Sequence, residues 1–211
     1  MSSRETQQKI LRTALDLFNA HGSRNISTHR IAYQCGISKG NLHYHFRTKQ
    51  DIVLELFSQM KAEMNAGWYE DHLTPTLEHM SYMFERQLEM IWRYRFFYRE
   101  RSSLLGEMEL LQSRFHDVRQ RRLVEVRRFM QALIAEGYIK PFSSERELDL
   151  LITSTWILSD HWLEFAGATG DDLEGTVVRQ GFDLLLAVIA PHFTDEGRRL
   201  MRRRTSELEP A

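Results

Sequence analysis

The residues best suited to chemistry lie in one short segment, where nearly every side chain can donate a hydrogen bond. They are Ser38, Lys39, Asn41, His43, Tyr44 and His45. Such groups bind phosphate oxygens and the edges of nucleic-acid bases. Leu42 and Phe46 are left to anchor the segment to the rest of the protein. A helix this short is unstable on its own, so its dense polar face predicts a binding surface.

The elements that must position this segment are predicted by capping residues and by one glycine. Ser27 is suited to cap a helix over residues 28–35, and Gly36 begins a tight turn. The polar segment then forms a second short helix over 38–45. A first helix over residues 3–21, ended by a glycine, completes a three-helix head. This arrangement is the helix-turn-helix, which places its second helix in the major groove of DNA.

From Thr28 to Lys49 the sequence resembles the TetR family of bacterial regulators. The family pattern reads roughly Thr-x-x-x-Ile-Ala, followed by Gly-Val-Ser-x-Gly-x-Leu-Tyr-x-His-Phe-x-x-Lys. The matching residues, at the same spacing, are Thr28, Ile31, Ala32, Gly36, Ile37, Ser38, Gly40, Leu42, His45, Phe46 and Lys49. With the preceding helix, the specific matches cover about a quarter of the chain. One residue departs from the pattern, because His43 stands where the family commonly has tyrosine.

The resemblance implies that these polar residues bind double-stranded operator DNA. Those implied to hold phosphates are Thr28, Tyr44 and Lys49, with His43 as the substituted member. Those implied to lie nearest the base edges are His29, Lys39 and Asn41. Lysine suits guanine there and asparagine suits adenine. Ser38 and His45 belong to the same surface, and His45 suits either role. Because histidine titrates near pH ~6.5, the substitution at position 43 also makes a pH-sensitive affinity an expectation.

Charge is distributed unevenly along the chain. Residues 1–50 carry eight lysines and arginines against two acidic residues, a net charge of +6. The whole chain has a net charge of −1, so the other 161 residues total −7. A basic segment joined to an acidic body suggests that the N-terminal part meets a polyanion. We therefore expect a DNA-binding domain at residues 1–50 and a second domain at residues 51–211.

The second domain has helical periodicity and shows no convincing strand pattern. After a fourth helix from near Lys49 to about residue 70, the expected helices span 75–94, 96–105, 108–136, 144–167, 172–190 and 194–204. Prolines and glycines separate them. The predicted fold is all-α, with helix four linking the head to a larger helical domain. The resemblance implies that this larger domain binds a ligand and forms a dimer.

Two groups of mainly aromatic residues are candidates for an effector site in the second domain. They are Trp92, Phe96, Phe97 and Tyr98, followed by Trp156, Asp160, His161 and Trp162. In the resembled family the equivalent helices enclose an apolar cavity with a few polar groups, as small-molecule sites generally do. The expected ligand is an unidentified small molecule of apolar or aromatic character. The alternative is that these side chains belong to the core or to a subunit interface.

Apolar stripes on the last two long helices suggest an interface between two copies. The resemblance implies that these helices pair with their copies in a homodimer. The interface residues we expect are Leu163, Val177, Val178, Gly181, Phe182 and Leu185. Gly181 inside a helix costs about 1 kcal/mol relative to alanine, so the close approach of another helix would explain it. Either stripe would equally serve as intramolecular core.

Other function classes find little support in the sequence. No acid–base pair, nucleophile or phosphate-binding glycine loop is evident, so we expect neither an enzyme nor a cofactor. His43 and His45 point about 200° apart on a helix, which argues against a metal site there. The single cysteine, Cys35, excludes an internal disulfide, and no apolar run approaches the ~18–20 residues of a membrane span. Without a secretory signal, we expect a cytoplasmic protein with no membrane partner.

Together these features predict a transcriptional regulator, specifically a ligand-responsive repressor that binds a pseudo-palindromic operator as a homodimer. The alternative is an all-helical ligand-binding or adaptor protein whose N-terminal module lacks DNA recognition. Salt-sensitive binding to genomic DNA fragments distinguishes the two, because an adaptor has no such affinity.

Overall fold

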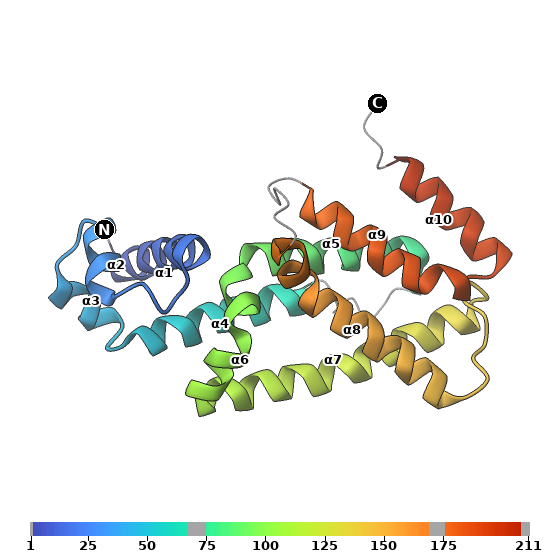
Figure 1. Ribbon diagram of the computed structural model, residues 1–211, viewed down its shortest axis with the longest axis horizontal. Coiled ribbons are helices and arrows are strands. Elements are labelled where there is room, and N and C mark those ends of the chain that lie inside the picture. Colours follow the sequence, from blue (N-terminus) through green and yellow to red (C-terminus); the bar gives the residue numbers. More distant parts are fainter. Residues whose placement is uncertain (1, 67–74, 169–175, 208–211) are drawn as a thin grey trace. The chain divides into compact units, whose positions relative to one another are not determined.

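The computed structural model describes residues 2–66, 75–168 and 176–207. These ranges contain ten α-helices and one short 3₁₀ helix, drawn in Figure 1. The elements are α1 (Ser3–His21), α2 (Thr28–Gln34), α3 (Lys39–His45), α4 (Lys49–Ala66), α5 (Leu77–Arg93), α6 (Arg95–Glu107), α7 (Glu109–Ala135), α8 (Glu145–Ala168), α9 (Val177–Ile189), η1 (Ala190–His192) and α10 (Asp195–Glu207). Among the described residues, β-type pairing is limited to an isolated bridge between Ile139 and Phe193. The predicted all-α fold is confirmed.

Helices α1 to α3, called the head below, begin where serine side chains cap them. The Ser2 hydroxyl accepts a hydrogen bond from the Glu5 backbone N–H at 3.3 Å, and the Glu5 carboxylate accepts one from Ser2 N at 2.7 Å. Ser27 and Ser38 cap α2 and α3 by accepting from the backbone N–H three residues on. Gly22 ends α1 with a φ of +79°, which side chains with a Cβ rarely adopt. The three predicted helices are present, each bounded within one residue of expectation.

The chain divides into two compact units. The first comprises residues 1–65 and 93–115, and the second comprises residues 66–92 and 116–211. This division differs from the expected boundary after residue 50, because α4 and α6 belong with the head. Aromatic packing explains the difference: the rings of Phe57 on α4 and Phe97 on α6 lie 5.5 Å apart, centroid to centroid. The first unit is therefore larger than a three-helix head.

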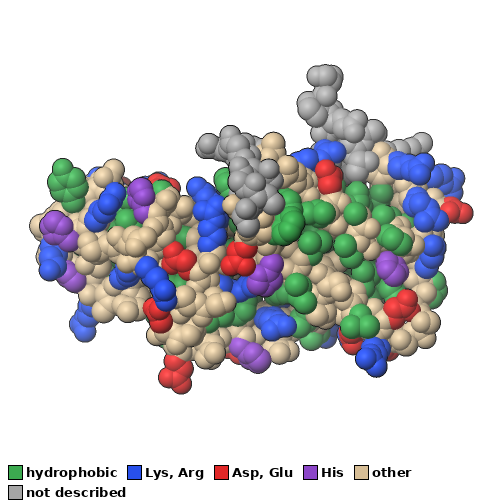
Figure 2. All heavy atoms as spheres, viewed as in Figure 1, with side chains coloured by type: hydrophobic (Ala, Val, Ile, Leu, Met, Phe, Trp, Pro, Cys, Tyr) green, Lys and Arg blue, Asp and Glu red, His purple; other side chains and the backbone are tan. Residues whose placement is uncertain are grey.

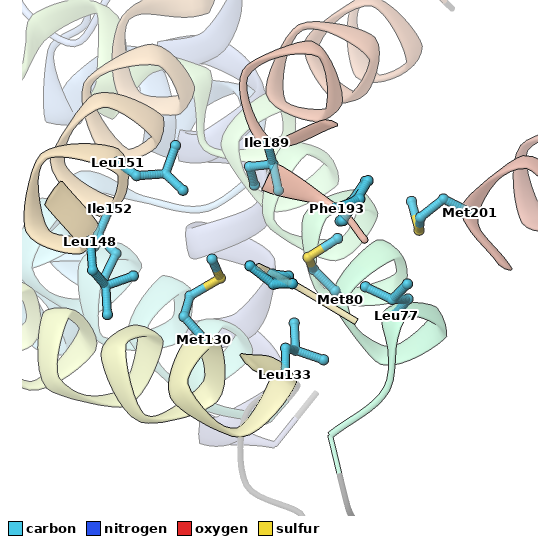
Figure 3. Close-up of a cluster of buried hydrophobic side chains, with 11 residues drawn as sticks. Leu77, Met80, Met130, Leu133, Leu148, Leu151, Ile152, Ile189, Phe193 and Met201 are labelled. Carbon is cyan, nitrogen blue, oxygen red and sulfur yellow. The ribbon is translucent and has the colours of Figure 1, made fainter. Parts of the chain in front are cut away.

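The second unit is built around a cluster of buried apolar side chains, drawn in Figure 3. Its buried members are Leu77, Met80, Met130, Leu133, Ile139, Leu148, Leu151, Ile152, Ile189, Phe193 and Met201. They come from α5, α7, α8, α9 and α10 and the segments between them, so the cluster joins helices that are far apart in the sequence. Gly197 lets α10 approach closely, since a Cβ at this position would collide with the carbonyl oxygen of Tyr138.

Candidate nucleic-acid interface

The second helix of the helix-turn-helix, α3, turns nearly all of its side chains outward. Among its residues, all of which the structure describes, only Leu42 is buried. The exposed side chains are those of Lys39, Asn41 and Tyr44, and those of His43 and His45 are half buried. Figure 2 shows Lys, Arg and His side chains spread over the head, at the left of the view. Helix α3 thus uses a single leucine to fill the core and presents cationic and hydrogen-bonding groups to the outside.

The imidazole of His43 is held by the backbone just after α3. Its Nδ1 lies 3.0 Å from the carbonyl oxygen of Arg47. A carbonyl oxygen only accepts hydrogen bonds, so Nδ1 carries the proton and Nε2 is the nitrogen left for a ligand. A neutral ring therefore offers a ligand an acceptor at Nε2, whereas a protonated ring offers a donor. His45 makes a different contact, an edge-to-face pairing with Tyr44 at 5.2 Å between centroids.

Lys49, expected to hold a phosphate, has contacts inside the head. Its Nζ donates to the carbonyl oxygen of Ser23 at 2.6 Å and lies 3.5 Å from that of Arg24. An ammonium group has three donors, so one is left for a phosphate when both carbonyl contacts are kept. The contact between Lys49 and DNA stays a prediction.

Helix α2 adds further side chains to this surface. Thr28 is half buried at its first position, and His29 beside it is exposed. Tyr33, which is not among the predicted binding residues, is 79% exposed. It lies four residues after His29 and therefore on the same face of the helix, and this spacing is the signal that identifies it. The exposed and half-buried residues of α2 and α3, together with Lys49, are called the head surface below.

The aromatic residues of α6 pack in the core of the first unit. Phe96, Phe97 and Tyr98 are each 3% exposed or less. The Phe96 ring lies 5.3 Å from that of Phe18 on α1, and the Phe97 ring lies 5.9 Å from that of Phe115. These contacts favour the core role that the sequence left open, and they lend no support to the effector role expected of these three residues.

In the second unit, α8 combines a tryptophan with a buried carboxylate. The Trp156 Nε1 donates to the Asp160 carboxylate at 2.9 Å, and Asp160 is buried. His161 is exposed, with its Nδ1 3.1 Å from the Glu164 carboxylate. Trp92 is half buried. Of the expected effector residues, the structure therefore brings together Trp156 and Asp160 by a hydrogen bond, and places exposed His161 and half-buried Trp162 in the lining of one apolar groove.

The outer faces of α8 and α9 form an apolar groove of about 680 Å³, called the α8–α9 groove below. Its lining residues are Ile157, Leu158, His161, Trp162, Phe165, Gln180, Asp183 and Leu184. Phe165 is 66% exposed and Ile157 is 55% exposed, although both side chains are large and apolar. Figure 2 shows hydrophobic side chains gathered over these two helices. Exposed apolar patches of this kind mark interaction sites.

Most of the expected interface residues pack inside one copy and do not line the α8–α9 groove. Leu163, Phe182 and Leu185 are buried within one copy, where Phe182 and Leu185 cluster with Leu88 of α5. A Cβ on Gly181 would lie 2.8 Å from Leu88 and 3.0 Å from Trp162, so the close helix approach inferred from this glycine is intramolecular. Half-buried Val178 packs on the same cluster, and the Val177 side chain lies outside the described residues. Within one copy the described part of this apolar stripe therefore packs as core, and its role in a dimer interface stays a prediction.

No helix among the described residues is long and apolar enough to cross a membrane. In the same residues, no three His, Cys, Asp or Glu side chains converge as a metal site requires.

Comparison with known proteins agrees with the geometry of the head and of the larger unit. A family model described as "Bacterial regulatory proteins, tetR family" matches residues 10–56, and one described as "Bacterial transcriptional repressor" matches residues 54–201. The chain belongs to the TetR family. The two matches overlap at residues 54–56.

Individual relatives of this TetR-family chain differ in how much of it they cover. The crystal structure of a TetR-family transcriptional regulator from Marinobacter aquaeolei VT8 is 30% identical over 100% of both chains, with a TM-score of 0.88. The regulator QacR from Staphylococcus aureus is 27% identical over 88 residues, 42% of this chain and 47% of QacR. The match thus spans about half the length of that curated relative. A regulator from Saccharomonospora viridis, in complex with choline, is 24% identical with a TM-score of 0.69 over 89% of this chain and 96% of its own, and shares the fold.

Proposed function

We propose that the chain is a transcriptional repressor that reads double-stranded operator DNA with α3. The observation that carries this proposal is the division of α3 between one buried leucine and an outward set of donors. A helix of this kind fits the major groove, where side-chain donors and acceptors distinguish base pairs. Family membership supports the same function.

The residues divide between two kinds of contact with DNA. Lys39 and Asn41, exposed in the first turn of α3, are proposed to read base edges together with His29. The residues proposed to hold phosphates are Thr28, His43, Tyr44 and Lys49. Phosphate contacts set register and salt dependence, and base contacts set sequence.

The test begins with the purified full chain and sheared genomic DNA. Fragments retained at moderate salt are sequenced, and affinity for an enriched site is measured over a series of salt concentrations. We expect a pseudo-palindromic site whose affinity falls steeply as salt rises. Absence of both enrichment and salt dependence would favour the adaptor alternative, and the protein would then bind ligand or partner without DNA.

A homodimer is the second part of the proposal, with the α8–α9 groove covered by the groove of a second copy. Support comes from exposed Ile157 and Phe165, whose burial against a copy removes apolar surface from water. A two-fold axis suits such a self-complementary surface. Two heads of a dimer then meet half-sites about 34–36 Å apart, which explains the expected pseudo-palindrome.

An effector acting on the second unit completes the proposal. The buried Asp160, hydrogen-bonded to Trp156, supplies a polar group beside an aromatic surface, as a site for an apolar or aromatic molecule needs. The complex of the Saccharomonospora viridis regulator with choline makes choline a sensible probe beside aromatic compounds. Quenching of tryptophan fluorescence, lost in Trp156→Phe, is the expected readout. We also propose a cytoplasmic location, where a bacterial regulator meets its operator DNA.

A further inference from the structure

One face of α6 is applied to the head along its whole length. The residues of this face are Phe96, Glu100, Ser103 and Glu107, whose spacing of four, three and four places them on one side of a helix. They contact Phe18, Ser23 and Arg24 at the end of α1 and in the segment that leads into α2. The order of these residues along α6 matches the order of their partners along the segment from α1 to α2.

The first contact caps α6 from another helix. The N-cap residue of α6, Tyr94, makes no capping hydrogen bond with its side chain. Asn19 of α1 supplies it instead: its side-chain oxygen accepts from Phe96 N at 3.0 Å, and its Nδ2 donates to the Arg93 carbonyl at 2.8 Å. One asparagine thus satisfies a backbone donor and a backbone acceptor where α5 meets α6.

Helix α4 holds the same end of α6. The buried Tyr94 hydroxyl donates to the Glu63 carboxylate at 2.7 Å, and Arg93 lies 3.1 Å from the same carboxylate. Burial and the neighbouring Glu63 raise the pKa of Tyr94 far above its usual value, so the phenol stays neutral and donates. The start of α6 is therefore fixed to both α1 and α4.

The central contact engages every polar group of Ser23. The Glu100 carboxylate accepts from the Ser23 backbone N–H at 2.8 Å and also from its hydroxyl. From α4, Lys49 donates to the Ser23 carbonyl oxygen at 2.6 Å. Ser23 is 2% exposed, so these hydrogen bonds replace water that the residue has lost. The approach is close, since a Cβ on Gly22 would lie 2.6 Å from Glu100 Oε1.

The last contact is an exposed ion pair. Arg24 donates to the Glu107 carboxylate and to the Ser103 hydroxyl. The hydrogen bond from Arg24 lowers the pKa of Glu107, so the carboxylate is charged throughout the neutral range. Exposed pairs contribute little, which leaves Glu100 and Ser23 as the contact on which the position of this segment most depends.

We propose that Glu100 is a positioning residue for DNA binding. By holding Ser23, it fixes the short segment between α1 and α2 and hence the orientation in which α2 and α3 meet the groove. A head that is not held must be ordered when DNA binds, and that cost lowers affinity. The inference rests on the proposed DNA-binding function.

The test compares Glu100→Gln with Glu109→Gln, in the full chain, on an operator fragment recovered from genomic DNA. Both variants remove one negative charge, and Glu109 is an exposed residue at the start of α7. Removal of a negative charge would by itself leave the affinity for DNA unchanged or raise it, because DNA repels carboxylates. We expect Glu100→Gln to weaken binding roughly tenfold, as loss of a charged hydrogen bond allows, and Glu109→Gln to bind like the unsubstituted protein.

Two further measurements separate positioning from other effects. The salt slope of Glu100→Gln should stay unchanged, because no phosphate contact is lost. Ser23→Ala, which keeps the carboxylate, should weaken binding less and be non-additive with Glu100→Gln. Equal or tighter binding by Glu100→Gln, with a normal thermal transition, overturns the inference. If Glu100→Gln does not fold, the operator affinity of Ser23→Ala decides. Weaker binding supports the inference, and equal or tighter binding overturns it. An unsubstituted protein that binds no DNA overturns the proposed function and this inference with it.

Discussion

The head surface and the α8–α9 groove both present side chains that their own unit does not bury, but their chemistry is opposite. The head surface offers donors and cations, such as Lys39 and Asn41, whereas the groove offers large apolar groups, such as Ile157 and Phe165. Attraction to a polyanion weakens as salt rises, and apolar burial does not. The two surfaces should therefore respond differently to salt, which allows each to be tested without disturbing the other.

The largest effect should come from a charge placed in the groove. Phe165→Arg removes an exposed aromatic ring and sets two like charges against each other across a two-fold axis. Burial of a phenylalanine contributes about 1.5–3 kcal/mol in each copy, so the dimer should weaken by roughly 100-fold or more. Light scattering should show monomers, and affinity for a two-half-site operator should fall with it.

The matched control is Val124→Arg, at a residue of α7 that is 50% exposed and lies outside the groove. It adds the same charge and should leave the dimer and the operator affinity unchanged. Dimers that persist in Phe165→Arg at high and low salt alike would place the interface elsewhere on the molecule.

A smaller and more local effect is expected from Asn41→Ala on α3. Loss of a bidentate contact to a base costs about 1–3 kcal/mol and should relax discrimination at one base pair of each half-site. Affinity for a set of single-base operator variants measures this directly. Equal weakening on every variant would contradict the assignment of Asn41 to a base edge and move it to the phosphate contacts.

The sequence predicted the head closely because α3 is only two turns long. A helix of that length can bury one residue such as Leu42, so the remaining polar side chains must face outward. The caps at Ser27 and Ser38 and the turn at Gly36 are local signals that depend on no distant contact. The identity and the exposure of the head surface were therefore accessible from local sequence alone.

The larger unit was less predictable for a physical reason. Periodicity identifies an apolar face, but it does not say which element covers that face. The stripe around Gly181 and Phe182 is covered by α5 of the same copy. Likewise Phe96 and Phe97 pack on distant residues of the first unit. Assigning such residues to core, interface or ligand site requires the tertiary contacts.

Lys49 belongs to the head surface and also supports the head internally, and a substitution distinguishes the two roles. Lys49→Ala removes the donor to Ser23 and any phosphate contact. Both losses should weaken binding to every sequence alike, by about tenfold. Loss of one phosphate contact also reduces the salt slope by about one unit, whereas loss of the Ser23 contact alone does not.

Lys61→Ala, at a half-buried lysine further along α4, is the control for the change in charge. It should alter neither the affinity nor the slope by a comparable amount. A slope unchanged in Lys49→Ala would remove Lys49 from the phosphate contacts and leave it as support for Ser23.

The smallest expected effect is a dependence of affinity on pH through His43. Its Nδ1 proton is engaged by the Arg47 carbonyl, so only the protonated ring has a donor at Nε2 for a phosphate oxygen. Binding should therefore be tighter where the His43 ring is protonated, and weaken by a few-fold from mildly acidic to mildly alkaline pH. The Glu107 carboxylate beside the head does not account for such a change, because Arg24 holds its pKa below the usual value.

The decisive variant is His43→Tyr, which restores the residue that the family commonly has. A phenol donates a hydrogen bond throughout this range, so the variant should keep its affinity at high pH and lose the pH dependence. The controls for His29 and His45 are His29→Asn and His45→Asn, which should retain the dependence on pH. A pH profile that survives in His43→Tyr and vanishes in either asparagine variant would assign the protonated contact to that other histidine.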